Sequence, residues 1–382
     1  MAACYRRRMN KLLVGVLVSL MLVACGDDAG SGGGGAGAGG RAGAGGAGAS
    51  GGGGAGASGA GAGAGGAGAG TGGAGAGGAG TGGAGTGGAG AGGAAGSGMA
   101  PSPLSFAAEV SQAQLTTSIA DLVAFRSRYT YGTGDEAARD YLVGRLAAYG
   151  LTAELDPFTV GTDTAENVIA KKPGTTEPGV VFIFSAHYDS TSGSPMTDAP
   201  GADDNASGVA AVLEAARVLA PHSFRYSLWF VFTAAEEQGS KGSAHLAQTL
   251  MANHVDVRGV IAPDMIAYWP LGDRDSFDIL GDPASTALVD RMAGIADQLG
   301  VAHKKWIRHD YCEGDDHTMF QNAGFPAITP MDCVEAHNIP SSGENTPHYH
   351  MPEDRPETLH MPFTTKVASV IVATFADLGV PL

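Results

Sequence analysis

A stretch rich in glycine and alanine sets the strongest limit on what this chain can fold into. Of the 63 glycines in the sequence, 41 lie between Gly26 and Gly98, where large apolar side chains are almost absent. Because such a segment buries too little apolar surface to offset the entropy lost on ordering, we expect it to be unfolded. The folded part then comprises the 283 residues from Ala100 to Leu382, which is enough for one large domain around a single core.

The expected domain is strongly acidic. It contains 17 basic and 36 acidic residues, which gives a formal charge of −19, and it contains all 11 histidines. Proteins that bind nucleic acid need a basic surface, so this charge excludes that class and we expect no nucleic-acid partner. The oligomeric state stays open, because no sequence pattern bears on it.

The N-terminus has the pattern of an export signal. Basic residues between Arg6 and Lys11 precede an apolar run from Leu12 to Ala24, which is too short to span a membrane comfortably. The Leu-Val-Ala-Cys sequence that ends at Cys25 resembles the lipobox of bacterial lipoproteins, in which the signal is cleaved before a cysteine that is then acylated. The resemblance implies an extracytoplasmic protein, anchored by lipid to a membrane of the bacterial cell envelope. An ordinary cleaved signal and a secreted protein are the alternative.

The chain is therefore expected to have three parts. Residues 1–24 are the lipoprotein signal peptide, residues 25–99 are the lipidated Cys25 with a flexible Gly/Ala-rich linker, and residues 100–382 are the folded domain. Cys312 and Cys333 remain in this exported domain, and such an even pair favours a disulfide. A zinc–thiolate site is the alternative, but the two cysteines lie 21 positions apart without a Cys-x-x-Cys motif.

Strands and helices are expected to alternate along the domain. Apolar runs at 180–186 and 226–233 are typical of strands buried on both faces, and helix-like patterns follow them. This alternation predicts the α/β class, as a single three-layer α/β/α domain with a mostly parallel mixed sheet. The expected helices cover residues 113–128, 135–149, 206–220, 243–251, 285–299, 317–322 and 364–378, and the expected strands cover 180–186, 226–233, 259–262, 277–280, 304–308 and 327–329.

Residues of the types that bind metal fall where the predicted strands end. His187 and Asp189 follow the first strand, Glu236–Glu237 the second and Asp264 the third, while Asp203–Asn205 opens the first crossover helix. Because parallel strands end at one edge of a sheet, we expect these side chains to lie close together. Buried carboxylates are unfavourable unless they are paired, and no lysine or arginine lies within three positions of them in sequence. Divalent metal ions are the simplest source of the missing positive charge.

Six segments resemble, in the same order, those of the di-zinc aminopeptidases, the bacterial leucyl aminopeptidase type of metallopeptidase family 28. The resemblance implies the zinc-peptidase (phosphorylase/hydrolase-like) architecture, with residues 100–382 as the zinc peptidase catalytic domain. Each segment alone is a weak signal, whereas the ordered set is specific. The segments are AHYDS (186–190), PGADDNASG (200–208), AAEEQGSKGS (234–243), DMIAYW (264–269), DDHTMFQNAGFPAI (315–328) and HMPEDRPETL (350–359).

The resemblance also implies a role for individual side chains. In that family one aspartate bridges two zinc ions, two further residues complete the protein ligands of each ion, a glutamate is the general base, and a second aspartate orients a histidine ligand. The peptide bond after the bridging aspartate is often cis. The matching positions are Asp204 as the bridge, His187 and Asp264 on one ion, Glu237 and His350 on the other, Glu236 as the base and Asp189 beside His187.

Two of these assignments have neighbouring alternatives. His350 is preferred to His348 as the ligand because the family-like Pro-Glu-Asp-x-x-Glu-Thr-Leu run follows it. Tyr349 is preferred to Tyr311 as the tyrosine that hydrogen-bonds the tetrahedral oxyanion, although packing in the core is an alternative role for it. Asp332 and the cysteine after it fall where the bacterial enzymes shape the side-chain pocket, so the preferred N-terminal residue is open.

The function that follows is a zinc-dependent exopeptidase with two zinc ions per chain. It is expected to remove N-terminal residues from peptides with a free N-terminus, by means of a metal-bridged hydroxide and Glu236 as general base. The alternatives are a glutaminyl cyclase-like enzyme with one zinc, a glutamate-type carboxypeptidase, and a non-catalytic lipoprotein that uses the fold for binding. The complete ligand set disfavours the non-catalytic reading, and the acidic site disfavours a carboxypeptidase, which needs arginines for a terminal carboxylate.

Overall fold

The computed structural model of the protein describes residues 100–269, 276–307, 314–332 and 346–382. The expected signal peptide, the lipidation at Cys25 and the linker lie outside these residues, as do Tyr311 and the expected disulfide between Cys312 and Cys333. Each of these remains a prediction from the sequence.

Eight strands form one mixed sheet in the order β1-β2-β4-β3-β5-β8-β6-β7. The central strands β4, β3, β5 and β8 are parallel, as is the pair of β6 and β7. Strand β2 pairs antiparallel to both β1 and β4, and β6 pairs antiparallel to β8. The expected α/β fold with a mostly parallel sheet is confirmed. The strands are β1 (Ala153–Val160), β2 (Asp163–Lys172), β3 (Glu177–His187), β4 (Tyr226–Thr233), β5 (Asp256–Ile261), β6 (Ser276–Gly281), β7 (Ala302–Ile307) and β8 (Ala327–Met331).

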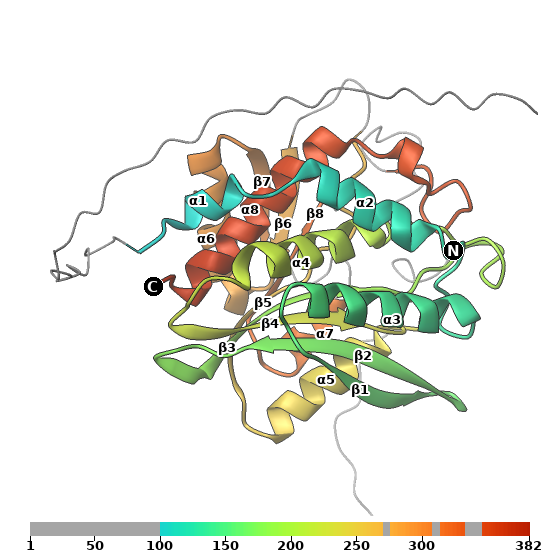
Figure 1. The fold of residues 1–382 in the computed structure, drawn as a ribbon, viewed down its shortest axis with the longest axis horizontal. Helices are drawn as coiled ribbons and strands as arrows, with labels where there is room; N and C mark the ends of the chain where they lie inside the picture. Colours follow the sequence, from blue (N-terminus) through green and yellow to red (C-terminus); the bar gives the residue numbers. More distant parts are fainter. Residues whose placement is uncertain (1–99, 270–275, 308–313, 333–345) are drawn as a thin grey trace, which may run out of the picture. The chain divides into compact units, whose positions relative to one another are not determined.

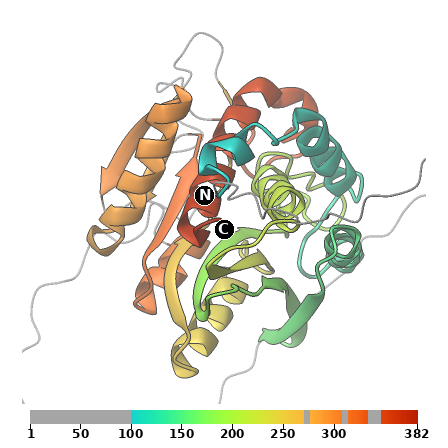
Figure 2. The same cartoon turned by 60° about the vertical axis from the view of Figure 1, so that its left-hand side comes forward.

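Helices cover both faces of this sheet (Figures 1 and 2). Helices α5 and α7 pack on one face, and most of the others pack on the opposite face, with α4 and α8 nearest to the central strands. Helix α8 is long and apolar enough to cross a membrane, but most of it is buried inside the domain. The helices are α1 (Pro103–Ala107), α2 (Gln112–Val123), α3 (Thr133–Ala148), α4 (Ala206–Leu219), α5 (Lys241–Ala252), α6 (Thr286–Leu299), α7 (Asp316–Asn322) and α8 (Met361–Gly379).

Strand β3 lies at the centre of the core. Phe182 and Phe184 point to the larger apolar cluster under α4 and α8, whereas Val181 and Ile183 point to the cluster under α5 and α7. Successive side chains of a strand point to opposite faces, so a strand between two helical layers needs apolar residues at every position. The uninterrupted apolar run in the sequence has this cause.

The sequence analysis missed one pair of strands and misplaced the end of one helix. The hairpin of β1 and β2 was not predicted, because β1 is an edge strand in which few residues are buried and Pro157 breaks the pattern. The helix expected at 113–128 ends at Val123 instead. Arg126 adopts a left-handed φ of 66°, and the turn there brings Arg128 into the interior, where it is fully buried.

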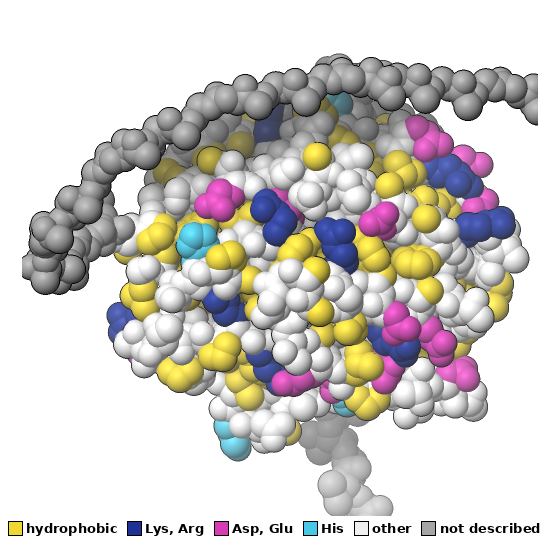
Figure 3. Space-filling view, viewed as in Figure 1, with side chains coloured by type: hydrophobic (Ala, Val, Ile, Leu, Met, Phe, Trp, Pro, Cys, Tyr) yellow, Lys and Arg dark blue, Asp and Glu magenta, His cyan; other side chains and the backbone are white. Residues whose placement is uncertain are grey.

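The helical face of the domain carries charges of both signs. Figure 3 shows this face, on which lysine and arginine side chains lie close to acidic ones over α2, α3 and α4. Arg217 pairs with Glu214 on α4, and Arg139 of α3 pairs with Glu166 of β2.

Candidate metal centre

The predicted site residues come from loops at one edge of the sheet. His187 is the last residue of β3, Glu236–Glu237 follows β4, and Asp264 lies shortly after β5. Asp204 precedes α4, and the peptide bond that joins it to Asn205 is cis. Because β3, β4 and β5 are mutually parallel neighbours, their carboxyl ends place these loops side by side.

Two groups of potential metal ligands meet at this edge, and they share one residue. The first is His187, Asp204 and Asp264, and the second is Asp204, Glu237 and His350; within each group the ligand atoms all lie within 4.8 Å of one another. Asp204 faces both histidines, with Oδ1 3.4 Å from Nε2 of His187 and Oδ2 3.3 Å from Nε2 of His350. The two groups of candidate ligands therefore meet at the carboxylate of Asp204.

The donor atoms of both groups suit zinc. Imidazole nitrogens and carboxylate oxygens are zinc ligands. Three of these atoms, Nε2 of His187, Oε1 of Glu237 and Oδ1 of Asp264, are buried without a hydrogen-bond partner. Buried polar atoms are normally satisfied, so atoms that converge here without hydrogen-bond partners suit the binding of a cation. The residues present therefore fit the metal that the sequence implied.

Asp189 is tied to both sides of this centre. Its Oδ1 lies 3.5 Å from Nδ1 of His187, on the side of the ring away from Asp204. The same carboxylate accepts hydrogen bonds from the backbone N–H groups of Glu236 and Glu237, at 3.0 and 3.2 Å. Asp189 thus orients one histidine and fixes the loop that carries the two glutamates, which agrees with the orienting position expected for it.

Glu236 lies beside the two groups but belongs to neither. Its Oε1 accepts a hydrogen bond of 2.8 Å from the Ser240 hydroxyl. Burial, together with the neighbouring carboxylates, raises the pKa of Glu236 well above its usual value. A carboxyl group with a raised pKa that lies close to potential metal ligands, without being one of them, has the properties of a general base.

His350, rather than His348, lies among the candidate ligands. Nε2 of His350 is 3.0 Å from Oε2 of Glu237, whereas His348 belongs to neither group of ligands. Burial alone lowers the pKa of His350, but the carboxylates of Asp204 and Glu237 outweigh it and raise that pKa to about 10. The ring of Tyr349 stacks on that of His350, with 3.7 Å between the ring centroids. The hydrogen bond from Tyr349 to the oxyanion stays a prediction.

Two residues that position the centre were missed by the sequence analysis. The carboxylate of Asp354 accepts hydrogen bonds from the backbone N–H groups of Asp203 and Asp204, at 2.9 and 3.0 Å. Arg128 is fully buried and donates to the carbonyl oxygens of Tyr188, at 2.7 Å, and Gly201, at 2.8 Å. Asp354 stands within the 350–359 segment already quoted, whereas no sequence pattern marks Arg128.

Replacement of Arg128 by methionine is expected to lower the free energy of unfolding by about 3 kcal/mol or more, because buried carbonyl groups lose their donors. Chemical denaturation measures this change. Arg258→Met is the matched control: Arg258 is half-exposed and pairs with Asp256, so its loss should change stability by less than about 1 kcal/mol. Equal losses in the two variants would show that Arg128 does not hold the loops together.

Known proteins are similar to this chain in sequence and in fold. The sequence profile of peptidase family M28 matches residues 167–375. A probable zinc metalloprotease of Pyrenophora teres f. teres is 30% identical over 71% of this chain and 67% of its own length, and one of Pyrenophora tritici-repentis is 29% identical over the same shares. The LapA aminopeptidase of Legionella pneumophila superposes with a TM-score of 0.62 at 20% identity, over 72% of this chain and 74% of that one. An aminopeptidase from Aneurinibacillus sp. superposes with a TM-score of 0.60 at 16% identity, over 74% of this chain and 97% of that one.

The α/β fold and the clustered zinc-type ligands define a zinc-dependent peptide hydrolase. The chain belongs to peptidase family M28. The family expected from the six sequence segments is thereby confirmed.

Proposed function

We propose that this protein is an aminopeptidase that holds two zinc ions per chain. The observation that carries the proposal is the sharing of Asp204 between two groups of ligands, His187 with Asp264 and Glu237 with His350. A one-zinc enzyme needs only one such group, so the shared carboxylate favours two ions over the glutaminyl cyclase alternative. The aminopeptidases of similar fold from Legionella and Aneurinibacillus are consistent with this reading.

The charge around the site supports a substrate with a free N-terminus. Asp315 and Asp316 lie near enough to Glu236 to raise its pKa, so the surroundings of the base are acidic. Arg128, whose charge reaches the centre, is fully buried and donates to backbone carbonyls. An acidic site attracts the terminal ammonium of a peptide, whereas a carboxypeptidase needs a basic group for the terminal carboxylate.

The side chains divide the chemistry among them. Zinc held by these residues would supply Lewis acidity, which would lower the pKa of a water molecule and polarise the scissile carbonyl. Glu236 takes the proton of that water on its carboxylate and passes it to the nitrogen of the leaving amine. Asp189 keeps the backbone of Glu236 in place while the proton moves. The hydroxyl of Tyr349 donates a hydrogen bond to the oxyanion that develops on the carbonyl oxygen.

The test is a zinc assay combined with a substrate panel on the purified chain. We expect two zinc ions per chain, hydrolysis of leucyl and methionyl anilides, and loss of that hydrolysis on chelation with recovery when zinc is returned. N-acetylated anilides should be inert, because the blocked amine carries no charge. One zinc per chain with a pyroglutamyl product would favour a cyclase instead, and full activity on N-blocked substrates would exclude an aminopeptidase.

We also propose that the protein is anchored in a bacterial cell envelope by lipid on Cys25. The support is the sequence alone, namely a basic N-terminus, a short apolar run and the lipobox-like residues before this cysteine. Stable anchoring needs more than one acyl chain, and a lipobox cysteine carries several. Cys25→Ala should move the protein from the membrane fraction to the soluble fraction; an unchanged membrane fraction would contradict the anchor.

A further inference from the structure

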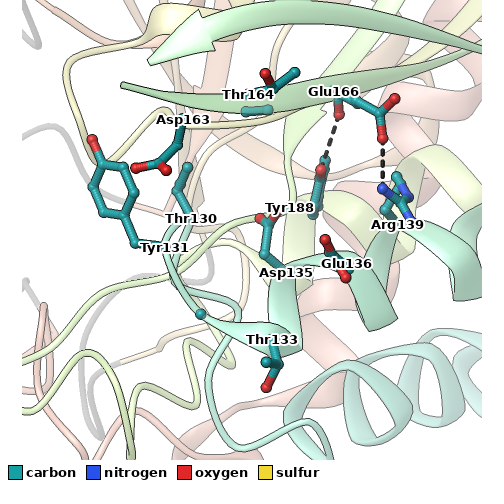
Figure 4. Close-up of a pocket in the computed structure, with 12 residues that line it drawn as sticks. Thr130, Tyr131, Thr133, Asp135, Glu136, Arg139, Asp163, Thr164, Glu166 and Tyr188 are labelled. Atoms are coloured by element: carbon teal, nitrogen blue, oxygen red, sulfur yellow. Dashed lines mark hydrogen bonds and ion pairs between the residues drawn. The ribbon is translucent and has the colours of Figure 1, made fainter. Parts of the chain in front are cut away.

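A pocket lies at the N-terminal end of α3, separate from the candidate metal centre. It has a volume of about 320 Å³, and its walls come from the start of α3, the loop before it, the start of β2 and Tyr188 after β3 (Figure 4). The residues that line it include neither Glu236 nor any member of the two ligand groups. A volume of this size is enough for a small organic ligand.

The lining of this pocket is acidic. It includes Asp135, Glu136, Asp163 and Glu166, with Arg139 as the basic lining residue. Arg139 is already occupied, because its guanidinium donates to Glu166 at 2.5 Å and, outside the pocket, to Asp140 at 2.8 Å. Three carboxylates therefore surround the pocket without a matching positive charge from its walls.

Asp135 is the deepest of the three. Its side chain points into the pocket in Figure 4, the residue is only 6% exposed, and its Oδ1 has no hydrogen-bond partner. Burial raises the pKa of Asp135 to about 8, and the nearby charge of Asp189 adds to the effect. A buried carboxyl oxygen without a partner is unfavourable, and a cation bound by this carboxyl group would offset that cost.

We propose that this pocket binds a protonated primary amine, with Asp135 as the counter-charge at its base. A primary ammonium carries three donors, and the hydroxyls of Thr130 and Thr164 in the lining offer further acceptors. Asp163 and Glu136, both exposed, add negative charge at the walls. The side chain of a lysine and a free alkyl diamine share this chemistry.

An organic cation fits the pocket better than a metal ion. Calcium takes six to eight oxygen ligands. Among the described residues, three carboxylate or imidazole ligand atoms come within 4.8 Å of one another only in the two groups that share Asp204. The pocket therefore lacks a set of carboxylates that converge on a point, while its volume exceeds that of a bare ion.

One residue that lines the pocket also contacts Asp189, beside the candidate metal centre. Thr130 lines it, and the Thr130 hydroxyl lies 3.2 Å from Oδ2 of Asp189, besides its shorter contact with Oε1 of Gln238. The same oxygen accepts the backbone N–H of Glu237. An ammonium that uses Thr130 as an acceptor therefore sits one side chain away from the residue that orients His187.

Titration of the zinc-loaded full chain with Nα-acetyl-lysine amide, followed by calorimetry at constant ionic strength, tests the proposal. This probe has no free α-amine, so it does not present the N-terminus that the proposed active site takes. We expect saturable binding, with no binding of the Nε-acetylated form. A parallel titration with 1,4-diaminobutane distinguishes the two sources of the ammonium group. Tighter binding of the lysine derivative identifies a lysine side chain, and tighter binding of 1,4-diaminobutane identifies a free diamine.

Asp135→Asn should weaken binding about tenfold or more, since it removes the charge from a charge-assisted hydrogen bond while keeping the shape. Asp290→Asn, an exposed residue of α6 with the same change in charge, should have no effect. Asp163→Asn, at an exposed position, gives a second variant that does not risk the fold and should weaken binding by a smaller factor. Failure of the ammonium probe to bind, equal binding by the wild type and both pocket variants, or binding of calcium chloride alone would overturn the proposal.

Discussion

Substitution of Asp204 by asparagine is expected to empty both metal positions at once. One carboxylate oxygen of Asp204 lies in each group of ligands, so the amide removes the negative charge from both and leaves nitrogen in place of one oxygen. Residues that only support a ligand change metal affinity by about 10–100-fold, and loss of a shared ligand should exceed that range. We expect zinc affinity to fall by more than about 100-fold, and peptide hydrolysis to fall with it.

Zinc content after dialysis against a weak chelator measures this effect, and thermal unfolding shows whether the fold survives. Asp256→Asn is the control, because Asp256 is half-exposed on β5 and pairs with Arg258 far from any candidate ligand. If the Asp204 variant keeps two zinc ions at wild-type affinity, the two groups do not share this carboxylate and the binuclear proposal is wrong.

The order of elements could be predicted from the sequence where burial leaves a strong pattern. Strands β3 and β4 lie between two helical layers, so both of their faces are apolar and their runs stand out. The β1–β2 hairpin gave no such signal. The hairpin lies at the edge of the sheet, where only β2 pairs with the rest of the sheet and most of β1 is exposed. A strand with one buried stripe and a proline resembles a loop until its partner is known.

The candidate ligands and Asp189 could be named from the sequence, whereas two further residues that support the site, Arg128 and Asp354, could not. His187, Asp204, Glu236–Glu237 and Asp264 follow strands or precede a helix, so sheet topology brings them together wherever the strands are parallel. Arg128 instead reaches a carbonyl 60 positions away, and Asp354 reaches backbone amides about 150 positions away. Contacts between a side chain and a distant backbone depend on the path of loops, which no local pattern fixes. Asp135, whose Oδ1 has no hydrogen-bond partner, was not singled out from the sequence either.

Neighbouring glutamates give the sharpest test of how catalysis and metal binding are divided. Glu237 belongs to a ligand group with Asp204 and His350, whereas Glu236 belongs to none. Glu236→Gln should therefore retain zinc and lower kcat by at least about 10²-fold, the lower end of what a general base contributes. Glu237→Gln should lose zinc from its group, because the amide cannot replace the negative charge beside His350.

The two variants differ by one position in the chain and by the same change of charge, so each is the control for the other. Zinc content and kcat are measured on both proteins, with KM as a check that substrate binding survives in Glu236→Gln. Both backbone N–H groups donate to Asp189, and neither substitution alters those bonds, so the loop should keep its shape. Turnover near that of the wild type in Glu236→Gln would show that the base lies elsewhere. Loss of zinc from both variants would show that Glu236 is itself a ligand. Proton transfer is assigned to Glu236 and metal binding to Glu237 only if Glu236→Gln keeps its zinc and Glu237→Gln loses it.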